Sequence, residues 1–201
     1  MTSPDPLYND WIHQQIRVRP DCLAVYDLTA DRPFTWKQFD ERVDALAHWL
    51  LHTGIRSGDR IAYLGLNSSD VLEIFFATLR IGAAYVPLNF RLTPPELSFI
   101  VSDCTPSAIF YDRSFRDVID AIDAKVEPKA LVESALDGSE SAYERCFLAD
   151  FAAIEPEAVN ADTLSMIMYS SGTTGKPKGV MYTRRMMLSS ALNLLQGSEA
   201  S

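Results

Sequence analysis

The sequence contains few cysteines, no long apolar run and no excess of positive charge, and each absence excludes a class of protein. The three cysteines, Cys22, Cys104 and Cys146, lack the short paired spacing of zinc sites, so we expect free thiols in a reducing, cytoplasmic setting. No stretch approaches the roughly 18 consecutive apolar residues of a membrane span, and residues 1–6 lack the features of a secretory signal. Eighteen Lys and Arg against 27 Asp and Glu give a net charge of −9, so nucleic acid is not an expected partner.

What the 201 residues do contain is a repeating pattern of short apolar runs and amphipathic segments. The hydrophobic content of 47% is enough for a substantial core. The runs that we predict as strands are 22–28, 61–66, 83–87, 108–111, 130–132 and 164–169. The first predicted helix contains Tyr8, Trp11, Ile12 and Ile16 and ends before Pro20. The second starts at Thr35 and ends at Gly54, the third runs through 71–79 and stops at Gly82, the fourth runs through 97–101 after Thr93, the fifth runs through 115–122, and the sixth covers 186–195. Strands alternating with helices favour an α/β fold with a mostly parallel sheet flanked by helices. Residues 133–162 form a long connection between two predicted strands, with one helical turn expected near Tyr143.

Two helix starts are marked by capping residues. Thr35 and Gln38 have the spacing of a capping box, as do Thr93 and Glu96. Ser114 is expected to cap the next helix. The helix after Thr35 carries its apolar residues at helical spacing, on one face, and these residues are Phe39, Val43, Leu46, Ala47 and Leu50.

For several other groups of residues we prefer a structural role over a functional one. His48 and His52 are four residues apart, as metal ligands on a helix can be, but they lie opposite the apolar face and we expect surface positions. The methionines that bracket residues 170–180 are expected to pack in the core, and they are Met166, Met168, Met181, Met186 and Met187.

The most informative segment is residues 169–180, which read YSSGTTGKPKGV. Four hydroxyls, three glycines and two lysines lie close together there, and residues 163–198 contain no acid. Glycines let backbone N–H groups turn toward an anion, while hydroxyls and lysines supply donors and charge, so the composition suits a polyphosphate cradle. A flexible polar hairpin is the structural alternative. A Walker P-loop is excluded, because only two residues separate Gly172 from Gly175 and Pro177 follows Lys176.

The run SSGTTGKPKG, residues 170–179, resembles the phosphate-binding signature of the adenylate-forming (AMP-binding) superfamily. Earlier segments resemble that family's landmarks in order, and they are 54–55, 58–60, 67–68, 82–83, 86–89, 91–93 and 96–97. Within the superfamily the chain is most similar to acyl-CoA synthetases, that is, fatty-acid–CoA ligases.

The resemblance implies ATP-dependent activation of a carboxylic acid, with fatty acids favoured, to an acyl-adenylate and then to acyl-CoA. ATP, Mg²⁺ and coenzyme A are the implied cofactors and co-substrates. The hydroxyl of Ser170 is implied to help hold the magnesium ion. The residues implied to bind ATP are Ser170, Ser171, Gly172, Thr173, Thr174, Gly175, Lys176 and Lys178. Arg184 and Arg185 stand where the family commonly has His-Arg.

The resemblance also implies that residues 1–201 are the N-terminal part of the large AMP-binding domain, without a complete second domain. The C-terminal domain and its catalytic lysine are then absent, and we identify no catalytic residue in the chain. We therefore expect a ligase fragment that is inactive alone. Two alternatives stay open: a non-catalytic remnant that binds a nucleotide or a partner, and half of a split ligase that a complementing polypeptide completes in trans.

Overall fold

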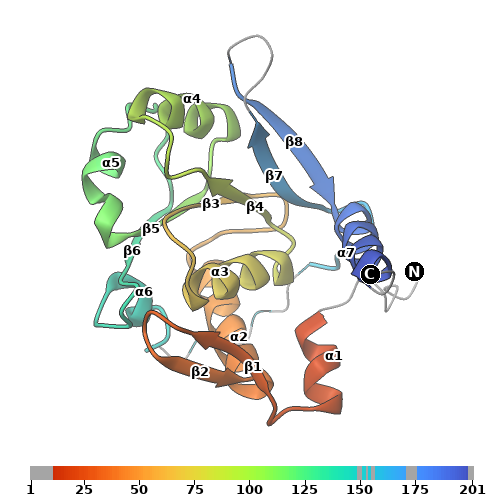
Figure 1. Cartoon of the computed structure of the whole chain (residues 1–201). Coiled ribbons are helices and arrows are strands. Elements are labelled where there is room, and N and C mark those ends of the chain that lie inside the picture. Colours follow the sequence, from red (N-terminus) through yellow and green to blue (C-terminus); the bar gives the residue numbers. More distant parts are fainter. Residues whose placement is uncertain (1–10, 149–150, 153, 155–156, 171–175, 199–201) are drawn as a thin grey trace.

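The computed structural model describes residues 11–148, 151–152, 154, 157–170 and 176–198. A six-stranded sheet in the order β6-β5-β3-β4-β7-β8 forms its centre (Figure 1). Its strands are β3 (Arg60–Leu64), β4 (Ala84–Leu88), β5 (Ala108–Asp112), β6 (Ala130–Ser134), β7 (Leu164–Ser170) and β8 (Lys178–Thr183). All pairings are parallel except that of β7 with β8, which is antiparallel. The predicted α/β fold with a mostly parallel sheet is confirmed.

Four helices, α2 to α5, cover the two faces of the sheet's centre. The helices in the described residues are α1 (Trp11–Val18), α2 (Trp36–His52), α3 (Ser69–Arg80), α4 (Pro94–Cys104), α5 (Arg116–Asp120), α6 (Ala142–Arg145) and α7 (Arg184–Ser198). One buried cluster packs α2 and α3 against one face of the sheet. A second cluster packs α4 and α5 against the opposite face. The strands between the two clusters are therefore buried on both sides, as parallel strands usually are.

The helix signals read from the sequence are mostly confirmed. Thr35 and Gln38 make the reciprocal bonds of a capping box at the start of α2. Glu96 accepts hydrogen bonds from the backbone N–H and the hydroxyl of Thr93 at the start of α4. Ser114 is not the cap that we expected, because the carboxylate of Asp112 accepts from its backbone N–H and from its hydroxyl.

The strand predicted over residues 22–28 is confirmed as β1 (Leu23–Asp27), but two other strands, β2 and β8, were not predicted. β2 (Arg32–Thr35) contains Pro33 and pairs with β1 in a separate antiparallel hairpin. β8 occupies residues that we read as loop. Its sequence shows no alternation of apolar and polar residues, because neither face of its first four residues is buried.

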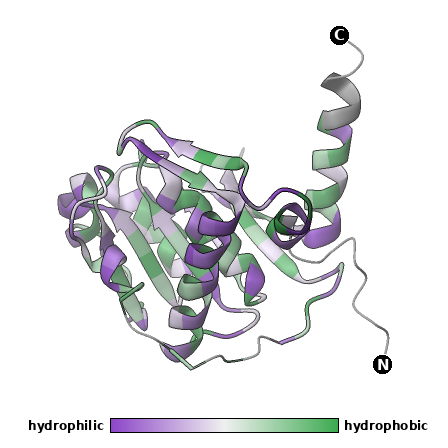
Figure 2. Cartoon of the chain, turned by 90° about the horizontal axis from the view of Figure 1, so that it is seen from below, coloured by the Kyte–Doolittle hydropathy of each residue, from purple (hydrophilic) through white to green (hydrophobic). Residues whose placement is uncertain are grey.

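The expectation that the methionines pack in the core is wrong for three of them. Met168, Met181 and Met186 are exposed, at 42%, 64% and 52% of their surface. Met166 is partly buried against the α2 and α3 cluster. The exposed methionines lie on β7, β8 and α7, at one edge of the sheet. Figure 2 shows α7 projecting away from the sheet at this edge.

The three cysteines are free thiols, with Cys22 exposed and the other two buried. Among the residues that the structure describes, none of the helices combines the length and apolar character needed to cross a membrane.

Candidate phosphate-binding site

The predicted cradle lies at the tip of the hairpin formed by β7 and β8. Ser170 is the last residue of β7, and it pairs with Lys178, the first residue of β8. The structure thus brings the first and last predicted binding residues of the segment side by side. The other predicted residues Ser171, Gly172, Thr173, Thr174 and Gly175 lie outside the described residues.

The hairpin register places the side chains of Ser170 and Lys178 on the same face. Residues directly opposite in an antiparallel pair project to the same side of the sheet, with their Cβ atoms about 5 Å apart. Met166, four residues before Ser170, shares this face and packs against the α2 and α3 cluster. Both Ser170 and Lys178 are exposed. A hydroxyl and an ammonium group are therefore available together on the α2–α3 side of the hairpin tip.

The opposite face of the hairpin is fixed to α4. Ile167 belongs to the α4 and α5 cluster, and the hydroxyl of Tyr169 donates to Asp103 Oδ2. Burial and the neighbouring Asp103 raise the pKa of Tyr169, so this phenol stays protonated as a donor. The contact holds the end of β7 in place close to the predicted cradle.

Gly179 is required by this packing. A Cβ atom at position 179 would come within 2.9 Å of Ile167 Cγ2 and 3.1 Å of Tyr169 Cζ. The glycine faces Tyr169 in the hairpin register, so its missing side chain lets the tyrosine ring lie against β8. One of the three glycines of the segment thus supports the hairpin's packing.

The two lysines have different surroundings. Lys176 Nζ lies 5.9 Å from the ring centroid of Phe99 on α4, within the range of a cation–π interaction. Lys178 is on the face of Ser170, away from the side on which Tyr169 reaches α4. The structure therefore assigns Lys178, rather than Lys176, to the same surface as the hydroxyl of Ser170.

The donors in the described part of the segment fit a phosphate group better than a metal ion. Two exposed lysines and a hydroxyl are present, and residues 163–198 contain no acid. Within the described ranges, no three His, Cys, Asp or Glu residues are placed to hold a metal ion. Magnesium prefers carboxylate or phosphate oxygens and keeps several waters. The one hydroxyl of Ser170 does not by itself make a magnesium site.

The side chains of Arg184 and Arg185, at the start of α7, contact other groups of the protein. Arg184 Nη2 donates to the carbonyl of Leu79, and Arg185 lies 3.3 Å from Asp162 Oδ1. The two histidines also have separate contacts: His48 Nδ1 is 3.7 Å from Asp44 Oδ2, and His52 Nε2 is 3.0 Å from the carbonyl of Ala152.

Sequence reasoning missed a largely buried ion-pair cluster that joins β2, α2, α3 and α6. Arg32 donates to Asp70 and Glu144, and Arg42 donates to Glu73 and Glu144. The fully buried Tyr143 donates to Glu73 Oε2 at 2.7 Å. Because the partners lie between 31 and 112 positions apart, only the helical turn at position 143 was visible in the sequence.

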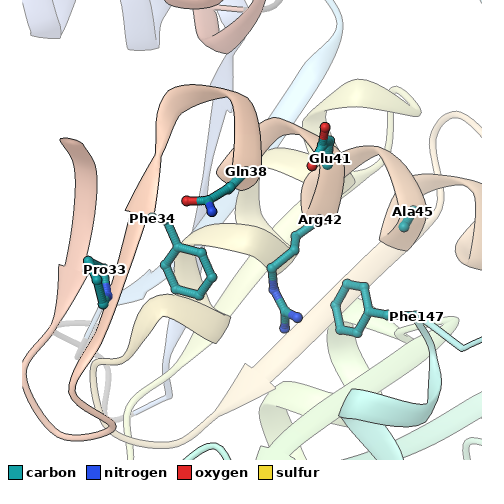
Figure 3. Close-up of a pocket in the computed structure, with 7 residues that line it drawn as sticks. All are labelled: Pro33, Phe34, Gln38, Glu41, Arg42, Ala45 and Phe147. Carbon is teal, nitrogen blue, oxygen red and sulfur yellow. The ribbon is translucent and has the colours of Figure 1, made fainter. Parts of the chain in front are cut away.

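A shallow cavity of about 410 Å³ lies beside this cluster, between β2, α2 and Phe147, which follows α6. Figure 3 shows the guanidinium of Arg42 pointing between the rings of Phe34 and Phe147. It lies 4.0 Å from the centroid of Phe147 and 5.7 Å from that of Phe34. Glu73 and Glu144 already neutralise the charge of this guanidinium, and Glu41 also lines the cavity, so the cavity offers no unpaired positive charge to an anion.

Comparison with curated proteins gives relatives that are ligases. A long-chain-fatty-acid–CoA ligase of Mycobacterium tuberculosis is 37% identical over 181 residues, which cover 90% of this chain and 35% of the ligase. An indoleacetate–CoA ligase of Aromatoleum aromaticum is 32% identical, over 96% of this chain and 38% of that protein. The chain thus spans about a third of the length of these relatives.

Comparison with solved structures also finds proteins that resemble this chain over most of its length. ATP-bound MatB from Rhodopseudomonas palustris superposes with a TM-score of 0.81 at 30% identity, over 94% of this chain and 37% of that one. The N-terminal domain of FACL13 from M. tuberculosis gives 0.74 at 34% identity, over 86% of this chain and 43% of that domain. The family model described as AMP-binding enzyme matches residues 12–200. With this match spanning nearly its whole length, the chain belongs to the AMP-binding enzyme family.

Proposed function

We propose that this chain contributes the nucleotide-phosphate site of an AMP-forming ligase that activates a carboxylic acid with ATP and transfers it to coenzyme A. The observation that carries the proposal is the hairpin tip of β7 and β8, where Ser170 and Lys178 lie side by side at the ends of the family's signature segment. Fatty acids are the proposed substrates, because a long-chain-fatty-acid–CoA ligase is among the relatives. The cytoplasm is the proposed setting.

The proposed binding residues are those of the signature segment. Lys178 supplies a positive charge to the β- or γ-phosphate, and Ser170 supplies a hydroxyl to a phosphate oxygen or to its magnesium ion. Bound magnesium would neutralise phosphate charge and so favour attack of the carboxylate on the α-phosphate. The remaining proposed contacts come from Ser171, Gly172, Thr173, Thr174, Gly175 and Lys176.

We further propose that residues 1–201 form part of one large AMP-binding domain and do not complete the reaction alone. Positioning of the reactants contributes much of the rate in such transfers, and a single polyphosphate cradle does not orient a carboxylate or a thiol. Pyrophosphate exchange measured on the pure chain with fatty and aromatic acids tests this point. We expect no acid-dependent exchange; exchange above the blank would contradict the proposed incompetence.

Comparing the dissociation constants of several phosphate-containing ligands tests the phosphate site itself. Because the proposed contacts are to phosphates and not to adenine or ribose, ATP, ADP and pyrophosphate should bind with similar dissociation constants in the sub-millimolar to millimolar range. A dissociation constant of about 1 mM corresponds to about −4 kcal/mol. AMP should bind more weakly. Selective binding of AMP over pyrophosphate in calorimetry would show that the chain recognises adenosine instead.

A further inference from the structure

The helix α4 contacts both arms of the β7–β8 hairpin near its tip (Figure 1). Tyr169, on β7, donates from its hydroxyl to Asp103 Oδ2, near the end of α4. Lys176 lies just before β8, and its Nζ is 5.9 Å from the ring centroid of Phe99. Phe99 and Asp103 are four positions apart, so they lie on one face of α4. A single helix face therefore supports the hairpin that carries the proposed phosphate site.

The end of α4 that carries Asp103 is itself fixed to the sheet. The buried side chains of α4 belong to the cluster that packs on β3, β4 and β5. Arg60, on β3, donates from Nε to the carbonyl of Cys104 and from Nη2 to the carbonyl of Thr105, both at 2.7 Å. Asp103 thus lies on a support that is held independently of the hairpin.

The position of Tyr169 determines the direction of its neighbour Ser170. Successive side chains of a strand project to opposite faces of the sheet. Tyr169 faces α4, so Ser170 faces away from α4, as does Lys178, its partner in the register. Gly179 leaves room for the tyrosine ring, while the hydrogen bond to Asp103 fixes where the hydroxyl end of the ring lies. The phosphate-binding face is thereby oriented by a contact on the other side of the sheet.

We propose that Asp103 is a positioning residue for phosphate binding, which acts through the hydroxyl of Tyr169 to hold the hairpin so that Ser170 and Lys178 face the phosphates together. The inference rests on the proposed function. Asp103 does not touch the ligand: its carboxylate lies on the α4 side of the hairpin, opposite the face of Lys178. A site that is correctly oriented in only a fraction of the molecules binds its ligand more weakly by that fraction.

The charge of Asp103 makes the sign of the effect diagnostic. A carboxylate near a phosphate site repels anions, so removal of its charge alone strengthens phosphate binding. Loss of a positioning contact has the opposite effect. Asp103→Ala should therefore weaken the binding of magnesium pyrophosphate, by about fivefold, although it removes a negative charge from the neighbourhood of the site.

Titrations of the purified chain with magnesium pyrophosphate, followed by phosphorus NMR, test the proposal. Asp103→Ala and Tyr169→Phe should each weaken binding about fivefold, and the double variant should be no weaker than either one, because all three lack the same contact. Asp103→Asn keeps an oxygen that accepts from the phenol, so its affinity should lie within about twofold of wild type. Asp117→Ala removes an exposed acid from α5, on the same side of the sheet, and should not weaken binding.

A destabilised control separates positioning from a general loss of structure. Thr35→Ala removes the capping box at the start of α2, away from the hairpin, so it should lower the melting temperature and leave pyrophosphate affinity unchanged. Equal weakening by Thr35→Ala and Asp103→Ala would overturn the positioning role. So would an Asp103→Ala affinity equal to or tighter than that of wild type, or additive losses in the double variant of Asp103 and Tyr169.

Lys178→Ala, measured in the same series, distinguishes failure of this inference from failure of the proposed function. Weaker binding by Lys178→Ala with no effect of Asp103→Ala would overturn the positioning role and leave the phosphate site standing. Unchanged binding by Lys178→Ala would refute the phosphate site, and the positioning role with it.

Discussion

Replacing Asp70 by Asn should change how the stability of this protein depends on pH. Asp70 is 1% exposed at the start of α3, and Arg32 Nη2 donates to its Oδ1 at 3.0 Å. Burial, followed by the nearby charge of Glu73, raises the pKa of Asp70 to about 7 in spite of the ion pair with Arg32. The carboxyl group is therefore largely protonated in the folded protein at pH values where it is ionised in the unfolded chain.

The sign of the effect follows from linkage. A folded-state pKa above the unfolded value gives stability that is fully present below about pH 4 and is lost as the pH rises through about 7. Between about pH 5 and pH 8 the loss covers roughly two pKa units, at about 1.4 kcal/mol each, or about 3 kcal/mol. Asparagine does not ionise, so the free energy of unfolding of Asp70→Asn does not contain this loss.

Urea unfolding of wild type and Asp70→Asn at several pH values measures the effect. Between about pH 5 and about pH 8 the stability of the variant relative to wild type should increase by about 3 kcal/mol. Asp117→Asn, on the exposed side of α5, controls for the removal of one negative charge. A difference between wild type and Asp70→Asn that stays constant over this range would refute the assigned burial of the charge.

Three other substitutions test the packing around the site and the cluster. Tyr143→Phe removes the hydroxyl that donates to the fully buried Glu73, and it should lower the free energy of unfolding by about 1–3 kcal/mol in urea titrations. Thr35→Ala removes the capping box of α2 and should cost about 1 kcal/mol in the same assay; an unchanged midpoint would contradict the cap. Gly179→Ala places a methyl group 2.9 Å from Ile167 Cγ2 and should destabilise the hairpin by about 1–3 kcal/mol, seen as faster amide exchange in β7. Unchanged exchange there would show that the hairpin accepts a side chain at this position.

The sequence predicted the elements whose burial is one-sided or complete, because these leave a periodic or continuous apolar pattern. α2 is the clearest case, since its apolar stripe and its capping box are both local signals, and both are confirmed. The short strands at the sheet's centre were found for the same reason. β8 was missed because its apolar residues face outward on both sides, which removes the period of two.

The candidate site could be predicted as a segment but not as a surface. Composition identified residues 170–178, whereas the pairing of Ser170 with Lys178 depends on the register of a strand that was not predicted. The position of Lys176 over Phe99 likewise depends on how α4 packs beside the hairpin. The cluster of Arg32, Arg42 and Glu144 left no local signal, since its members meet only in the folded chain.

The central claim is that the tip of the β7–β8 hairpin binds phosphate groups of ATP. Calorimetric titration of pyrophosphate with magnesium into wild type, Lys178→Ala and Lys37→Ala tests it most directly. Lys37 is exposed on α2, so its substitution removes one positive charge at a distance from the hairpin. We predict that Lys178→Ala weakens pyrophosphate binding about tenfold, the loss expected for one charge-assisted hydrogen bond, while Lys37→Ala leaves it unchanged. Equal affinities in wild type and Lys178→Ala would contradict the account.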